Sequence, residues 1–137
     1  MAMLKSNMEE LLSKAGYSAK AIKLYLTKTN VGSIENPDVA VSYTGLPCGD
    51  NITLYLKLKN DVICDAKFEY VGCVGTATSG SALTTILVGK TLAEAWNITK
   101  DDVLRELDGL PEPHCAELAV TALRKALEAL KESQQQK

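Results

Sequence analysis

Hydrophobic and polar residues alternate along two consecutive segments near the middle of the chain. The alternation covers residues 51–59 and residues 62–70, and Asn60-Asp61 between them has the composition of a tight turn. A shorter run rich in β-forming residues precedes them at residues 39–44. Alternation with a period of two, joined by short connections, predicts antiparallel strands with one covered face.

Helical spacing marks the segments on both sides of these strands. It is clearest near the C-terminus, where apolar residues from Cys115 to Leu130 recur at intervals of three and four. Capping signals and runs of small residues predict the other helices: residues 6–16 with Ser6 as cap, residues 19–26 after Ser18, residues 76–88, a helix from Thr91, and a helix from Thr99 to Gly109. We expect residues 132–137 to be a frayed tail.

The order of these elements defines the fold class. Strands come first and most helices follow, so we expect an α+β fold. Its core would be a three-stranded antiparallel sheet, with N-terminal helices and a C-terminal helical group packed on one face. A length of 137 residues fits one domain over residues 1–137.

Composition excludes several classes of function. A net charge of −2 and an aromatic content of 5% argue against a nucleic-acid binder, which needs basic residues for phosphates and aromatic rings for base stacking. The longest uncharged stretch, residues 71–89, is rich in Gly, Ser and Thr and is a poor membrane span. No targeting signal is visible at the N-terminus, so we expect a cytoplasmic protein with no membrane contact.

The four cysteines are widely spaced and form no Cys-x-x-Cys motif. Cys64 falls on the same side of the third strand as Phe68, so we expect it to be a buried small hydrophobic residue. The other three, Cys48, Cys73 and Cys115, lie at joints between predicted elements. In a cytosolic chain, widely spaced thiols serve metals or chemistry more often than disulfides.

A meander of three strands would bring these joints together. Cys48 lies between the first two strands and Cys73 follows the third, so both belong to the same edge of the sheet. The last helix must cover the apolar face, and it can carry His114 and Cys115 to that edge. Asp50, two residues after Cys48, adds an oxygen donor. The candidate site is therefore Cys48, Asp50, Cys73, His114 and Cys115.

The residue types at this site favour a soft metal. Helix N-termini stabilise thiolates, and Cys73 and Cys115 are both placed at predicted helix starts. Three sulfurs with Asp50 or His114 as fourth ligand suit zinc or an iron–sulfur cluster. A hydrolase that uses His114 and Cys115 is disfavoured, because adjacent residues on a helix point about 100° apart and form the nucleophile–base hydrogen bond poorly.

Five ordered motifs over about residues 17–130 resemble the IscU/NifU-type iron–sulfur cluster assembly scaffolds. They are Asn30-Val31-Gly32, Cys48-Gly49-Asp50, Asp65-Ala66-Lys67-Phe68 leading to Gly72-Cys73, Gly89-Lys90-Thr91-Leu92-Ala93-Glu94-Ala95, and Gly109-Leu110-Pro111 leading to His114-Cys115. The resemblance implies an α+β fold with a three-stranded antiparallel sheet packed against helices. It also implies a scaffold or carrier rather than an enzyme.

The resemblance further implies a cargo and partners. A pyridoxal-phosphate cysteine desulfurase would hand over persulfide sulfur, an iron donor would supply iron, and the finished [2Fe–2S] cluster would pass to apo-proteins. The implied ligands are Cys48, Cys73 and Cys115, with Asp50 or His114 completing the set. Zinc would occupy the same site in the cluster-free form.

The segment before His114 departs from the family pattern. Most members carry a Pro-Pro-x-Lys-x-His-Cys type of segment, whereas this chain has Pro111-Glu112-Pro113-His114-Cys115, which is shorter and lacks the lysine. That segment docks an Hsp70-type chaperone in some relatives, so the departure argues against chaperone-assisted release here. The insertion between the second and third cysteines that is usual in the zinc-dependent sulfurtransferase branch is also missing.

Two functions stay open at this point. In the first, the chain is a scaffold that holds a transient cluster on its cysteines. In the second, it is a zinc-dependent sulfur acceptor of the same family, in which zinc holds the site and Cys48 or Cys115 carries persulfide. The sequence also leaves the oligomeric state open, including a homo-oligomer.

Overall fold

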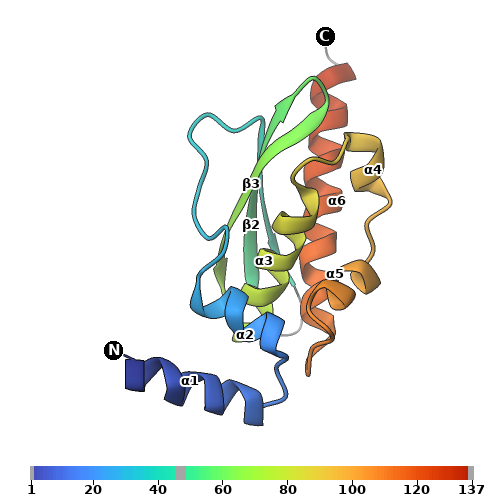
Figure 1. Cartoon of the computed structure of the whole chain (residues 1–137). Coiled ribbons are helices and arrows are strands. Elements are labelled where there is room, and N and C mark those ends of the chain that lie inside the picture. The colour runs from blue at the N-terminus through green and yellow to red at the C-terminus, as the bar shows by residue number, and fades with distance from the viewer. Residues whose placement is uncertain (1, 46–48, 136–137) are drawn as a thin grey trace.

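The computed structural model describes the backbone of residues 2–45 and 49–135 and the side chains of residues 7–45 and 49–132 (Figure 1). Three strands form one antiparallel sheet in the order β1-β2-β3. Helices stack against one face of this sheet (Figure 1). The N-terminal helices lie at the end of the sheet where β1 ends and β2 begins (Figure 1). The predicted α+β class and its three-stranded sheet are confirmed.

The strand boundaries follow the alternation in the sequence closely. Strand β1 covers Val39–Thr44, β2 covers Asn51–Lys59 and β3 covers Val62–Val71. The β2–β3 hairpin turns at Asn60 and Asp61, which both have positive φ values of 55° and 63°. Asn and Asp tolerate this left-handed conformation better than other residues with a side chain, so the predicted tight turn has the right chemistry.

The expectation that Cys64 is buried is wrong. The pairing of β2 with β3 shifts after Lys57, so that Leu58 pairs with Ile63 and Cys64 is left without a partner in the register. This β-bulge reverses the inward and outward alternation on its far side. Ile63 is therefore fully buried, and Cys64 is exposed.

Two helices form the layer that covers the sheet. Helix α3 covers Val74–Leu87 and α6 covers His114–Gln135, and they pack on each other and on the strands (Figure 1). Helix α3 is buried almost all round, which explains its Gly, Ser, Thr and Ala content. A Cβ atom at Gly80 would lie 2.4 Å from the buried Phe68 ring, so only glycine lets the helix approach the sheet this closely.

The remaining helices are short. Helix α2 covers Ala19–Leu26, as predicted, and α4 and α5 cover Leu92–Trp96 and Lys100–Glu106. Helix α1 covers Ala2–Lys14, so Ser6 lies inside this helix and the predicted cap there is wrong. The preceding Ala, Met, Leu and Lys residues are good helix formers, which lets the helix extend past the capping-box spacing. At the other end, α6 continues to Gln135, and the expected fraying of residues 132–137 stays a prediction.

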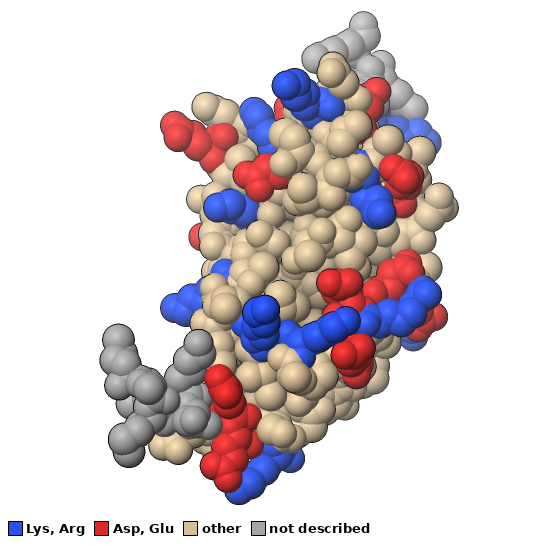
Figure 2. Space-filling model, in the orientation of Figure 1, with Lys and Arg blue, Asp and Glu red and all other residues tan. Residues whose placement is uncertain are grey.

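The surface carries charges of both signs. On the face shown in Figure 2, Lys and Arg side chains lie interspersed with Asp and Glu side chains, and tan surface separates these groups. Within the described residues, no helix is both long and apolar enough to cross a membrane.

Candidate metal centre

The site lies where the ends of three strands meet the starts of two helices. Thr44 at the end of β1 pairs with Asn51 at the start of β2, and Asn51 pairs with Val71 at the end of β3. The chain turns from β3 directly into α3, with Cys73 as the N-terminal cap residue of that helix. The meander thus brings the strand ends to one edge, as the alternation in the sequence predicts.

Three ligand atoms converge at this edge. The Sγ atoms of Cys73 and Cys115 lie 3.8 Å apart, and Oδ2 of Asp50 lies 3.6 Å from Sγ of Cys73. Each of the three residues offers a ligand atom within 4.8 Å of the other two. The sulfur separation is far longer than a disulfide bond, and both thiols are free. This spacing allows a single metal ion to contact all three side chains.

Helix α3 supplies two residues that shape the site. Thr76 is buried, and its hydroxyl donates a hydrogen bond of 2.7 Å to Oδ2 of Asp50. The same hydroxyl lies 3.7 Å from Sγ of Cys73 and 4.0 Å from Sγ of Cys115. At Gly75 a Cβ atom would lie 2.9 Å from Sγ of Cys115, so glycine leaves the room that this sulfur occupies.

Burial, rather than the position at a helix start, controls the pKa of the Cys115 thiol. Cys115 is 1% exposed, and burial raises its pKa to about 12, with the charge of nearby Cys73 acting in the same direction. The sequence-based expectation that a helix N-terminus makes Cys115 a thiolate is therefore wrong for the metal-free protein. Burial also raises the pKa of Tyr17, and the charges of Cys73 and Glu112 add to that shift.

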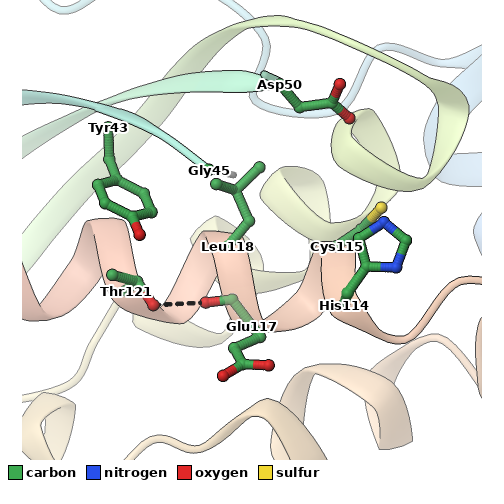
Figure 3. Close-up of a pocket in the computed structure, with 8 residues that line it drawn as sticks. All are labelled: Tyr43, Gly45, Asp50, His114, Cys115, Glu117, Leu118 and Thr121. Atoms are coloured by element: carbon green, nitrogen blue, oxygen red, sulfur yellow. Dashed lines mark hydrogen bonds between the residues drawn. The ribbon is translucent and has the colours of Figure 1, made fainter. Parts of the chain in front are cut away.

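A cavity of about 220 Å³ opens beside Cys115 (Figure 3). Asp50 lines it from the loop just before β2 (Asn51–Lys59), and His114 and Cys115 line it from the start of α6 (Figure 3). Further along α6, Glu117, Leu118 and Thr121 complete the lining together with Tyr43 and Gly45. The exposed His114 thus lies beside the buried thiol at the entrance of the site.

The structure adds two residues that the sequence reasoning missed. Thr76 follows Cys73 by three positions. This helical spacing places both residues on one face, so the sequence alone could have predicted that Thr76 lies near the site. Glu112 precedes the His114-Cys115 pair, and its Oε2 atom is 3.6 Å from Sγ of Cys73. It also groups with His114 and Cys115, with one ligand atom from each residue within 4.8 Å of the others.

Not every predicted site residue belongs to this cluster. Cys48 lies outside the described residues, so its role as a ligand stays a prediction. Asp50, Cys73, His114 and Cys115 lie at the predicted edge, and their role as ligands also stays a prediction. Cys64 lies in the bulge near the start of β3, whereas Cys73 follows the end of that strand.

Comparisons with known proteins agree with the motifs in the sequence. The profile of the NifU-like N-terminal domain matches residues 16–137. An iron–sulfur cluster assembly scaffold protein IscU of Archaeoglobus fulgidus is 42% identical over 81% of this chain and 74% of its own length. The IscU scaffold protein of Buchnera aphidicola is 40% identical over 81% of this chain and 92% of its own length.

A solved structure shows the same fold. The N-terminal part of a NifU-like protein from Brucella abortus superposes with a TM-score of 0.67 at 19% identity, covering 84% of this chain and 94% of that one. One relative, from Yarrowia lipolytica, is named as mitochondrial, so the expected cytoplasmic location stays a prediction. From the profile match and the two IscU relatives together, the chain belongs to the NifU-like N-terminal domain family.

Proposed function

We propose that this protein is a scaffold for iron–sulfur cluster assembly. In this role it accepts sulfur from a cysteine desulfurase, assembles a [2Fe–2S] cluster from that sulfur and donated iron, and transfers the cluster to apo-proteins. The observation that carries the proposal is the convergence of Asp50, Cys73 and Cys115 at one sheet edge in a chain whose relatives are named as scaffolds. Anaerobic assembly of a cluster on the chain itself is the experiment that tests it.

The proposed cluster ligands are Cys48, Cys73 and Cys115, with Asp50 or His114 as the fourth. Two thiols and a carboxylate that lie together in the metal-free protein need little rearrangement to bind iron. Cys73 is exposed, which leaves its sulfur accessible to a sulfur donor or a cluster acceptor. Cys48 and Cys115 are the proposed persulfide acceptors.

The high pKa of Cys115 fits a site that is filled and emptied. A metal ligand must be a thiolate, so cluster binding has to displace the Cys115 proton. The displaced proton lowers the net affinity, and it can return when the cluster leaves. A site of this kind is suited to holding its cargo temporarily.

A zinc-dependent sulfur acceptor is the second candidate. The observation that favours it is the carboxylate of Asp50, which the Thr76 hydroxyl already holds beside two thiols. Two sulfurs and a carboxylate, with a third cysteine or a histidine, also satisfy tetrahedral zinc. In that case zinc would fill the site, and Cys48 or Cys115 would carry persulfide to an acceptor.

An anaerobic assembly assay tests the scaffold proposal. The full chain is incubated with a cysteine desulfurase, cysteine, ferrous iron and a reductant, because persulfide sulfur needs two electrons to become sulfide. We expect iron and acid-labile sulfide to accumulate on the chain in equal amounts and then move to an apo-ferredoxin. Cys64→Ser is the matched control, since Cys64 is exposed and lies apart from the cluster. A chain that retains zinc and persulfide but assembles no sulfide would favour the second candidate.

A further inference from the structure

Glu112 directs its carboxylate at both thiols of the site. Its Oε2 atom lies 3.6 Å from Sγ of Cys73 and 3.9 Å from Sγ of Cys115. It is an exposed residue, so its side chain has water as an alternative to this position. The carboxylate nevertheless lies over the pair of sulfurs.

The backbone around Glu112 is restricted by its neighbours. Pro111 and Pro113 flank it, and a residue before proline is biased toward extended conformations. The carbonyl of Glu112 accepts a hydrogen bond from the Cys115 N–H at 3.2 Å, which joins this segment to the first turn of α6. Glu112 is therefore presented to the site by a stiff segment whose position is coupled to that of Cys115.

Two donor sets then share the Cys115 sulfur. One consists of Asp50, Cys73 and Cys115, and the other of Glu112, His114 and Cys115. Each set contains a carboxylate and the shared thiol, and their remaining members are a second thiol and an imidazole. A hard oxygen donor on each side of a thiol suits a divalent cation of intermediate softness, such as Fe²⁺ or Zn²⁺.

A helix start offers a simpler role for an acidic side chain. A carboxylate near a helix N-terminus is stabilised by the helix dipole, and Glu112 precedes α6 by two residues. That role places the carboxylate on backbone N–H groups, whereas the observed contacts of Oε2 are with sulfur. In the metal-free chain both thiols can donate weak hydrogen bonds to this carboxylate. Once the thiols lose their protons to bind metal, three negative groups lie together, and that arrangement is favourable only with a cation between them.

We propose that Glu112 is an oxygen ligand for the divalent metal ion that this site binds. The proposal rests on the metal-binding function proposed above and extends it by a ligand that the sequence motifs do not include. At this position the chain offers the metal an oxygen donor with a negative charge. The second donor set would hold the ion on the α6 side of the shared thiol.

The test is a titration of the full, reduced chain with Co²⁺, a spectroscopic substitute for zinc and ferrous iron. Thiolate-to-cobalt charge-transfer absorption counts the sulfur ligands, and the ligand-field bands report the remaining ligands. Glu112→Gln removes the charge and keeps the size. Glu128→Gln is the matched control, because Glu128 is an exposed glutamate of α6 that lies about 20 Å along the helix axis from the start of this helix.

We expect Glu112→Gln to raise the dissociation constant for Co²⁺ about 10-fold or more, with ligand-field bands shifted and charge-transfer intensity unchanged. Glu128→Gln should match the unsubstituted chain. The difference should persist in 1 M NaCl, which shortens the Debye length to about 3 Å and removes the influence of distant charge. Persistence of the full difference there supports direct ligation.

Three results would overturn the proposal: equal affinities for the Glu112→Gln and Glu128→Gln chains, a difference that vanishes at high salt, or a loss of charge-transfer intensity in Glu112→Gln. In each of these cases the unsubstituted chain still shows thiolate ligation, so the thiol site on which the proposed function depends is unaffected. If the unsubstituted chain shows no charge-transfer absorption at all, the thiol site itself is wrong and the proposed function fails with it.

Discussion

Helix α3 begins differently from helices α4 and α5. Thr91 caps α4 and Thr99 caps α5, and in each helix the third residue returns a hydrogen bond to the backbone of the cap, which completes a capping box. Helix α3 begins at Cys73, whose side chain makes no capping hydrogen bond. The Cys73 sulfur instead faces Asp50 and Cys115.

The difference teaches how the chain divides stability and function. A side-chain cap stabilises a helix by about 1 kcal/mol, and α4 and α5, which lie apart from the site, have this stabilisation. At α3 the cap position holds a thiol, a weak hydrogen-bonding group but a strong metal ligand. The start of α3 therefore lacks the stabilisation of a side-chain cap, and the cap position holds a sulfur at the edge of the sheet instead.

The largest expected effect separates two cysteines by reactivity. Because its pKa is raised to about 12, Cys115 at pH 8 has a thiolate fraction about 10³-fold below that of an ordinary thiol. Cys64 is exposed to reagent. We expect iodoacetamide to modify Cys64 at least 10²-fold faster than Cys115 in the metal-free chain, as measured by mass spectrometry of peptides over time. Raising the pH should speed the Cys115 reaction up to about pH 12. Equal rates at pH 8 would show that burial does not control this thiol.

Substitution of the α3 cap should change binding and stability in opposite directions. In Cys73→Ser, serine is a good cap residue but a poor ligand for Zn²⁺ or Co²⁺. We expect affinity for either ion to fall about 100-fold, while the metal-free chain becomes more stable by up to about 1 kcal/mol. Metal titration and urea unfolding measure the two effects. A destabilised chain that still binds tightly would break the comparison between the helix starts.

Thr76 should have a smaller effect on binding because it acts through Asp50. Thr76→Val keeps the shape and removes the hydroxyl that holds Oδ2 of Asp50. We expect about a 10-fold loss of metal affinity, similar to the loss of other hydrogen bonds that orient a ligand. Thr76→Ser, which restores the hydroxyl, should recover most of it. If the valine and serine chains bind equally, the hydrogen bond does not position the carboxylate.

The smallest effect concerns the capped helices. Thr91→Ala and Thr99→Ala should each reduce the free energy of unfolding by about 1 kcal/mol, because each removes a side-chain cap. Metal affinity should stay unchanged in both, since these helices contribute no member of the two donor sets. Urea unfolding and Co²⁺ titration are the measurements, and a large change in affinity would contradict the separation of the two regions.

Local patterns were enough to predict most of the fold. The strands follow period-two alternation closely, because one face of the sheet is buried and the other is only partly covered. Ser18, Thr91 and Thr99 cap their helices as predicted, since a cap depends on residues within one turn. The bulge at Cys64 cannot be read from the sequence of β3 alone. It is a shift in the pairing of β2 with β3, and it leaves no mark on the alternation within β3.

The candidate site was predictable only in part. Asp50, Cys73 and Cys115 could be brought together by topology, because their positions at element ends are visible in the sequence. The protonated state of Cys115 could not, because it depends on burial by residues far away in the chain. The contact of Glu112 with both sulfurs depends on the direction of a side chain between two prolines, which no periodicity reports.

The most direct test of the account is the iron and acid-labile sulfide content of the full chain after anaerobic reconstitution, compared with Cys115→Ser and Cys64→Ser. The account predicts equal amounts of iron and sulfide on the unsubstituted chain and on Cys64→Ser, and no stable cluster on Cys115→Ser. A Cys115→Ser chain that retains the iron and sulfide of the unsubstituted protein would contradict it.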